Sequence, residues 1–186
     1  MRMIKVPTSM KVPDFLAWAE TQPEGRRYEL VSGEPVAMAR DTVQHNRTKL
    51  ASSVALRDAV RAAGLAREVF IDGVGIEIND KTLRIPDASV QCGTNQDPDS
   101  TILESPLIAV EVISPSVERD DTEAKLIDYF SVASICHYLI VFSEKRAVVH
   151  HQRNERGTLD TRIASDGDIV FDPPGLAVSV AALLGP

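Results

Sequence analysis

The stretch Leu107 to Ile113, with the sequence LIAVEVI, decides the fold that we expect for this chain. It is continuously apolar except for Glu111, and such a run between turn signals is typical of a strand buried in the centre of a sheet. An unpaired carboxylate in a buried strand is costly, so it must be neutralised, paired or bound to a metal. Glu111 is therefore the first candidate site residue, with a structural ion pair to an arginine as the alternative.

Helices and strands are expected on both sides of this central strand. The residue patterns and the Gly, Pro and Ser turn signals place them as follows. We expect helices at residues 13–20, 43–63 and 118–130, a hairpin at 27–38 with its turn at Ser32 and Gly33, strands within 67–79, 82–92, 137–143 and 146–152, short strands near Thr161 and Ile169, and a closing helix or strand at 177–184. This order indicates an α/β (α+β) domain with a central mixed β-sheet flanked by helices.

Two finer expectations concern how these elements pack. The helix at 43–63 carries an apolar stripe that we expect to face the core, formed by Val43, Leu50, Val54 and Val60. The dipeptide Asp72-Gly73 is a hairpin-type turn, so the strands on either side of it should pair in a meander.

The bulk composition fits one ordinary globular domain spanning residues 1–186. Hydrophobic residues make up 44% and charged residues 25% of the 186 residues. The net charge of -7 argues against a protein that coats nucleic acid, so any such contact must be local. No apolar run is long enough to span a membrane or resembles a signal peptide, which favours a cytoplasmic location. We interpret Cys92 and Cys136 as core residues.

Asp87 is the second candidate, because it follows Pro86 at the start of the strand DASVQC. If this strand pairs with the one that holds Glu111, the two carboxylates converge at one end of the sheet. Such an oxygen-rich pair suits Mg²⁺, which needs only one or two carboxylates and completes its shell with waters and phosphate. Taken alone, Pro-Asp is a common loop dipeptide, so the inference depends on the pair.

Asp121, Lys125 and Tyr129 follow one another at spacings of four in the helix after the central strand. Four residues turn a helix by about 400°, so these three side chains lie on one face. They could form part of the site. The alternative is an ordinary surface pair between Asp121 and Lys125.

Taken together, these motifs resemble the Uma-two family of restriction-endonuclease-like proteins in the PD-(D/E)XK nuclease superfamily. The resemblance covers nearly the whole chain and rests on the motifs YELVSGE at 28–34, His45, PDASV at 86–90, VEVISPS at 110–116, and the positions Asp121, Lys125, Tyr129 and Tyr138. The chain departs from the family pattern at Ser32, Ser134, His137 and Leu139. The resemblance implies a restriction-endonuclease-like fold with Asp87 and Glu111 as metal ligands.

The same resemblance implies a lysine close to the two acids. The superfamily pattern places it two residues after the second acid, a position filled here by Ile113, which should then be a core residue. Lys125 is the candidate that replaces it. Glu29 and His45 match further polar positions; Glu29 is either a second metal ligand, the partner of Lys125 or a surface glutamate.

These residues predict an endonuclease that hydrolyses phosphodiester bonds with Mg²⁺ or Mn²⁺, on DNA more than on RNA. We expect a homodimer and no membrane partner. The alternatives are a catalytically inactive binding or regulatory protein with the same fold, and a metal-dependent hydrolase that is not a nuclease. His150 and His151 point to opposite faces of a strand, and we expect both at surface or edge positions.

Overall fold

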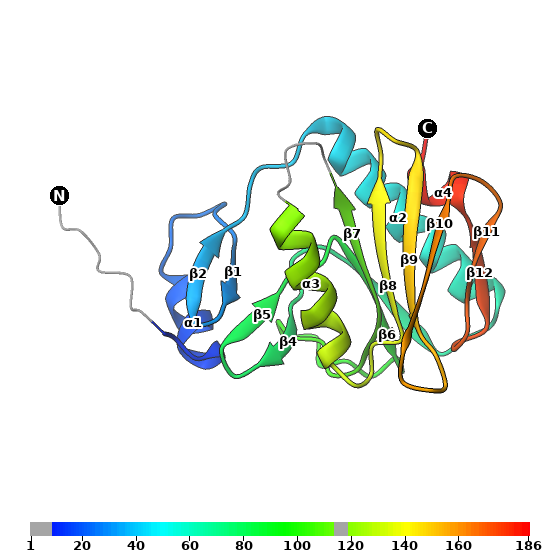
Figure 1. Ribbon diagram of the computed structural model, residues 1–186. Coiled ribbons are helices and arrows are strands. Elements are labelled where there is room, and N and C mark those ends of the chain that lie inside the picture. Colours follow the sequence, from blue (N-terminus) through cyan, green and yellow to red (C-terminus); the bar gives the residue numbers. More distant parts are fainter. Residues whose placement is uncertain (1–8, 114–118) are drawn as a thin grey trace.

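The computed structural model describes residues 9–113 and 119–186, and the side chains of residues 119–121 lie outside this description (Figure 1). Its helices are α1 (Val12–Glu20), α2 (Val43–Ala62), α3 (Arg119–Ser131) and α4 (Val180–Leu184). Its strands are β1 (Tyr28–Val31), β2 (Glu34–Ala37), β3 (Arg67–Ile71), β4 (Ile76–Asn79), β5 (Thr82–Arg84), β6 (Ala88–Cys92), β7 (Pro106–Ile113), β8 (His137–Phe142), β9 (Ala147–Arg153), β10 (Leu159–Ala164), β11 (Asp168–Phe171) and β12 (Leu176–Ser179). In the described part of the chain, no helix has the length and apolar character needed to cross a bilayer.

A six-stranded sheet in the order β10-β9-β8-β7-β6-β3 forms the centre of the molecule (Figure 1). Strands β7 and β8 are parallel and are connected through α3, whereas the other neighbours are antiparallel. The sheet is therefore mixed, as the sequence predicts. Every residue of β7 from Pro106 to Val112 is buried, which confirms the central strand.

Helices cover both faces of this sheet, and residues of β7 alternate between the two cores. Val110 and Val112 pack on the side of α2, together with Leu56. Ala109 packs on the other side, with Tyr129 of α3. This alternation follows from the period of two in a strand, so a strand buried on both faces is apolar throughout.

A smaller sheet in the order β2-β1-β5-β4 packs against α1 through Phe15, Leu30 and Leu83. The predicted hairpin of β1 and β2 is confirmed, with positive φ angles of 50° at Ser32 and 85° at Gly33. A Cβ at Gly33 would lie only 2.7 Å from Cα of Ser9, so both its φ and its surroundings require glycine. The hairpin fixes the position of β1, which carries a residue of the candidate site.

The apolar stripe predicted for α2 holds at Val60, which is buried in the core, and fails at its first two members. Val43 is 70% and Leu50 55% exposed, whereas polar side chains of α2 face inward. The hydroxyl groups of Thr48 and Ser52 donate to the carbonyl oxygens of Leu184 and Leu183 in α4. Carbonyl groups at the end of a helix have no partner within the helix, so this interface needs hydrogen-bond donors.

The hairpin predicted at Asp72-Gly73 is also wrong. Both residues have the positive φ angles of such a turn, 44° and 82°. However, β3 pairs with β6 in the large sheet, and β4 pairs with β5 in the small sheet. The turn therefore carries the chain from one sheet to the other.

His150 is a third correction, because it is buried and not at the surface. It shares a 2.9 Å hydrogen bond with Nδ1 of His137, and both rings contact Phe171. Its neighbour His151 faces the other side of β9 and bonds to the hydroxyl group of Thr161. The two histidines do face opposite ways, as the strand period requires.

Candidate active site

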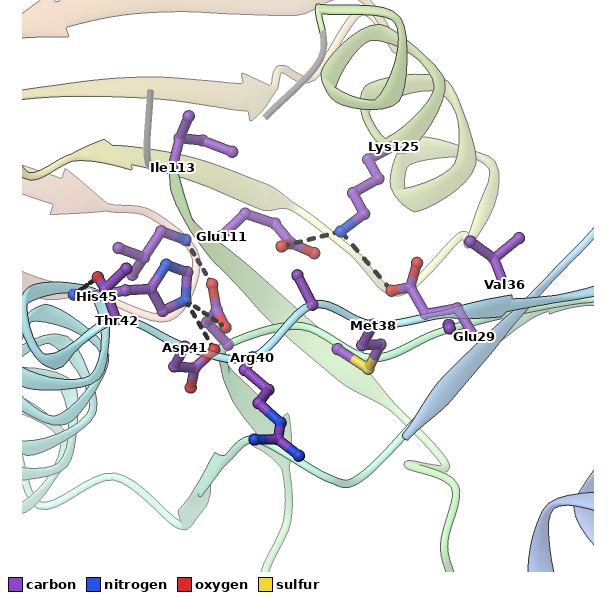
Figure 2. A pocket seen from close by; sticks show the side chains of 14 residues that line it. Glu29, Val36, Met38, Arg40, Asp41, Thr42, His45, Glu111, Ile113 and Lys125 are labelled. Atoms are coloured by element: carbon purple, nitrogen blue, oxygen red, sulfur yellow. Dashed lines mark hydrogen bonds and ion pairs between the residues drawn. The ribbon is translucent and has the colours of Figure 1, made fainter. Parts of the chain in front are cut away.

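A cavity of about 340 Å³ lies beside the end of β7, between the small sheet, the start of α2 and α3 (Figure 2). Its ionisable lining residues come from separate parts of the chain. They are Glu29 of β1, Arg40 and Asp41 before α2, His45 of α2, Asp87 just before β6, Glu111 of β7 and Lys125 of α3. The structure therefore brings the candidates Glu29, His45, Asp87, Glu111 and Lys125 to one cavity. Of the remaining candidates, Tyr129 contacts Glu111, and the side chain of Asp121 lies outside the described residues.

Asp87 and Glu111 are neighbours because of the β6–β7 register. Ala88 pairs with Val110, so the next pair in this antiparallel register would be Asp87 and Glu111. Asp87 Oδ2 accepts a 2.7 Å hydrogen bond from the backbone N–H of Val112. The two acids thus stand side by side at the same end of the large sheet.

Glu111 is held by two side chains of α3. Tyr129 donates a 2.7 Å hydrogen bond to Oε1, and Lys125 Nζ lies 3.1 Å from Oε2. Burial raises the pKa of Glu111 to about 7, since the charges of Asp87 and Glu29 add to that effect and only Lys125 and Tyr129 oppose it. Glu111 therefore holds a proton more readily than a carboxyl group in water does.

Lys125 enters the cavity from the wall opposite β6 and points between two carboxylates (Figure 2). Its Nζ lies 3.7 Å from Glu29 in addition to the contact with Glu111. Lys125 is buried, so it is not the exposed lysine of the alternative interpretation. Ile113, at the strand position of the superfamily lysine, lines the cavity and packs half-buried against the α3 side of the sheet.

Asp87 is surrounded by cations on its other side. His45 Nε2 lies 3.3 Å and Lys49 Nζ 3.0 Å from its Oδ1. Burial raises the pKa of Asp87, but the hydrogen bond from His45, the charge of Lys49 and the N–H of Val112 outweigh it, and the pKa lies below its ordinary value. The hydrogen bond to Asp87 in turn raises the pKa of His45.

The position of His45 follows from the start of α2. Thr42 caps this helix, and its hydroxyl oxygen accepts a 3.1 Å hydrogen bond from the backbone N–H of His45. Such a cap satisfies one of the N–H groups that a helix start leaves unpaired. It fixes the first turn, so the His45 ring lies over Asp87.

Lys49 is a site neighbour that the sequence analysis did not identify. It is only 1% exposed, and its Nζ also lies 2.7 Å from Asp41 and 3.1 Å from Asp72. The signal was present, because Asp41, His45 and Lys49 follow one another at spacings of four, as the candidates of α3 do. Because an apolar face was expected for α2, this polar spacing was not used to identify Lys49.

Arg84 is the second residue that was not identified. Its guanidinium lies 3.1 Å from Glu29 and 2.7 Å from Asp128. Glu29 also accepts a 2.9 Å hydrogen bond from the backbone N–H of Ile85. Of the roles proposed for Glu29, the contacts show that of partner to Lys125, whose Nζ lies 3.7 Å from its Oε1.

The residues present fit a magnesium-type ion. Within residues 9–113 and 122–186, no three His, Cys, Asp or Glu side chains could hold a metal ion together. The ligands that the resemblance implies are the two carboxylates of Asp87 and Glu111. Two carboxylates are sufficient for Mg²⁺, and an ionised carboxylate offers about four lone-pair positions. Asp87 and Glu111 therefore keep acceptor capacity beyond the contacts described above.

A second cavity of about 500 Å³ shares residues 37–41 with the first. Three arginines line it: Arg26, Arg27 and Arg40. Arg27 is paired with Asp72, and Arg40 lines both cavities. This second cavity is also lined by the acids Glu24 and Asp41.

Comparisons with known proteins bear on the fold and the family. The protein of Synechocystis sp. (strain ATCC 27184 / PCC 6803 / Kazusa) named "Uncharacterized protein slr1290" is 26% identical over 154 residues, which cover 77% of this chain and 74% of that protein. A crystal structure of "a putative nuclease belonging to DUF820" from Anabaena variabilis ATCC 29413 superposes with a TM-score of 0.75 at 12% identity, covering 94% of this chain and 97% of the other. This likeness shows the fold.

The family described as "Uma2: Putative restriction endonuclease" matches residues 12–183, which include all five candidates that line the cavity. The predicted resemblance and the restriction-endonuclease-like fold are thereby confirmed, and the chain belongs to the Uma2 family.

Proposed function

We propose that this protein is a metal-dependent endonuclease that hydrolyses phosphodiester bonds of nucleic acid, DNA in preference to RNA. The observation that carries the proposal is the pairing of Asp87 and Glu111 at the ends of adjacent strands, with Lys125 directed at Glu111 across an open cavity. Family membership supports a nuclease-like function. The roles of individual residues below are part of the proposal.

Asp87 and Glu111 would hold Mg²⁺ or Mn²⁺. When bound, such an ion polarises a phosphate group and lowers the pKa of a bound water. Tyr129 and Lys125 keep the Glu111 carboxylate in one orientation, since each contacts a different oxygen. The N–H of Val112 does the same for Asp87.

Lys125 and His45 supply positive charge on the two sides of the acid pair. The Lys125 ammonium stabilises negative charge that develops on the phosphate oxygens, which a fixed charge in a partly dry cavity does effectively. His45 has a raised pKa and so holds a proton more readily than a free histidine. In that form it keeps Asp87 ionised.

The arginine-lined cavity gives the nucleic-acid backbone a path to these residues. Phosphate groups bind arginine through charge and paired hydrogen bonds. Arg40 is exposed and lies where the two cavities meet, so it would contact the phosphate next to the scissile one. A local path of this kind is compatible with the net charge of -7.

The proposal also includes a homodimer and a cytoplasmic location. Two copies of one site are the simplest means of cutting both strands of a duplex. The cytoplasm is where a nuclease of this kind would meet intracellular DNA.

A catalytically inactive binding protein is the second candidate, and one observation favours it. Each acid already has a lysine partner, Lys49 for Asp87 and Lys125 for Glu111, so the pair is partly compensated without a metal. The experiment below distinguishes the two candidates.

The test is cleavage of single-stranded, duplex and branched DNA and of RNA by wild type and Asp87→Asn, with Mg²⁺, Mn²⁺ or EDTA. We expect metal-dependent cleavage of DNA by wild type and none by Asp87→Asn. In parallel, millimolar Mn²⁺ should raise the melting temperature of wild type but not that of Asp87→Asn, each compared with its own value in EDTA.

A rise in melting temperature without cleavage would favour the binding protein. Cleavage that persists in EDTA, or equally in Asp87→Asn, would overturn the proposed site.

A further inference from the structure

Strand β10 lies at one edge of the large sheet, drawn in orange beside β9 in Figure 1. Among residues 9–113 and 119–186 it pairs with β9 alone, and residues 159–163 are all exposed. Its sequence, LDTRIA, contains no proline or lysine, and its two charged residues, Asp160 and Arg162, have opposite signs. The edge is therefore available to a further strand.

The hydrogen bonds of β9 show which N–H and C=O groups of β10 point toward β9 and which point toward the free edge. The N–H of Arg153 in β9 donates to Cys136 O on the β8 side, and the N–H of Asn154 donates to Thr158 O on the β10 side. Successive residues of a strand alternate in direction, so even-numbered residues of β9 face β10. Even residues of β10 pair with even residues of β9, such as Arg162 with His150.

The odd-numbered residues of β10 therefore direct their N–H and C=O groups outward. These are Leu159, Thr161 and Ile163, and their six backbone groups form a regular row of donors and acceptors. A row of this kind is satisfied by an added antiparallel strand whose own odd residues face it.

We propose that the occupant is β10 of a second copy of this chain, paired antiparallel about a two-fold axis at Thr161. Leu159 then lies opposite Ile163 of the partner subunit, and Thr161 opposite Thr161 of the partner subunit. On the other face of the sheet, Asp160 lies opposite Arg162 of the partner subunit. Each contact occurs twice, as the symmetry of such a dimer requires.

The charged side chains favour this register over registers shifted by one or two residues. A shift by one residue is excluded, because it would pair outward-facing residues with residues bonded to β9. A shift by two residues in either direction places Asp160 opposite itself or Arg162 opposite itself across the axis. Like charges directly opposite are destabilising, whereas opposite charges stabilise a strand pair.

The apolar side chains of β10 support the same register. Leu159 is 39% and Ile163 76% exposed, although both are large and apolar. Both lie on the face shared with Val149 of β9, because Ile163 pairs with Val149 in the sheet. Pairing about Thr161 brings each Leu159 against an Ile163 and covers both.

The inference rests on the homodimer of the proposed function and names its interface, but it does not depend on nuclease activity. Asp87 and Glu111 belong to β6 and β7, and β8 and β9 separate β7 from the β10 edge. The dimer would form one continuous sheet and leave both cavities open.

Charge exchange across the axis tests the inference, in EDTA and without nucleic acid, by sedimentation velocity at micromolar concentration. Wild type should be a dimer. Asp160→Arg and Arg162→Asp each place like charges opposite one another twice, and each should raise the dissociation constant about tenfold or more. An equimolar mixture of the two variants restores both opposite pairs, so the mixture should form a heterodimer.

Arg57→Asp makes the same charge change as Arg162→Asp, at an exposed position of α2, and should leave the dimer unchanged. Melting temperatures confirm that each variant is folded. A monomeric wild type would overturn the inference. So would single variants that dimerise like wild type, or a mixture that stays monomeric.

Discussion

Glu111 depends on Lys125 for its charge, and this dependence gives the first prediction. Without Lys125, burial and the charges of Asp87 and Glu29 act on Glu111 with less opposition, so its pKa should rise further. Lys125→Ala should keep the fold but lose cleavage by a factor of about 10² or more, as expected for the loss of one electrostatic stabiliser. Initial rates with duplex DNA and Mg²⁺ measure this.

Two controls accompany that variant. Lys81→Ala removes an exposed lysine and should leave the rate unchanged. Ile113→Val changes the strand position two residues after Glu111, which packing fills, and should cost about 0.5 to 1.5 kcal/mol of stability without loss of cleavage. A Lys125→Ala protein as active as these controls would reduce the site to its two acids.

Lys49 gives the second prediction, on stability. It is buried among Asp41, Asp72 and Asp87, so Lys49→Met leaves three carboxylates without their common cation. Removing one member of a buried charge network costs about 3 to 5 kcal/mol. Urea unfolding of the variant should show a loss of this size.

The exposed pair of Lys11 and Asp80 is the matched control for that measurement. Their side chains are 3.1 Å apart but mostly in water, so Lys11→Met should cost less than about 1 kcal/mol. Equal losses in the two lysine variants would show that the network around Lys49 contributes no more than a surface pair.

Among the helices and strands, the sequence predicted correctly those features that depend on a few adjacent residues. The apolar run of β7 and the Ser32-Gly33 hairpin are confirmed, because each is specified by burial period and turn geometry within a few residues. Asp72-Gly73 has equally good turn geometry, yet its strands find partners far along the chain. Its failure as a hairpin shows that pairing is a property of the whole sheet.

The candidate site was predicted to a similar extent. The structure brings Asp87, Glu111 and Lys125 together, and their catalytic roles remain predictions. Arg84 was not identified, since a single arginine in a sequence gives no sign of the carboxylates around it. Lys49 was not identified although its spacing of four from His45 was visible in the sequence. Both are buried only because acids from other elements surround them.

The buried histidine pair between β8 and β9 gives a prediction on pH. Burial lowers the pKa of His137 and lowers that of His150 to about 4. In the unfolded chain a histidine titrates near 6.5, so between these values the unfolded state binds more protons. Stability is therefore full above about pH 6.5 and falls as the pH drops toward 4, by up to about 3 kcal/mol for His150.

Urea unfolding at about pH 7.5 and about pH 5 measures this loss. His150→Gln keeps a side-chain amide for the hydrogen bond with His137 but cannot titrate, so its stability should fall less between the two pH values. The same fall as in wild type would contradict the assignment. His137 is one of the departures from the family pattern, and its ring forms the hydrogen bond with His150.

For the whole molecule, the question is how a chain with a net charge of -7 binds a polyanion. Arg40, where the two cavities meet, is predicted to contact one phosphate. Arg40→Gln should weaken DNA binding at every sequence and reduce the slope of log affinity against log salt by about 1. Fluorescence anisotropy of labelled DNA, with Ca²⁺ in place of Mg²⁺ and at several salt concentrations, measures the affinity and the salt slope.

Arg61→Gln, at an exposed position of α2, is the control and should change neither quantity. An unchanged salt slope in Arg40→Gln would place the nucleic-acid backbone elsewhere on the molecule.

The side chains that line the cavity come from three parts of the fold. Lys125 belongs to α3 on one face of the large sheet, His45 to α2 on the other face, and Glu29 to the small sheet. The site therefore requires α2, α3 and the small sheet to be in place together. A chain still emerging from the ribosome, or one damaged so that any of these parts comes loose, has its acids without their cations. Under the proposed function, only the fully folded chain would cleave DNA, and an incompletely folded chain would be inactive.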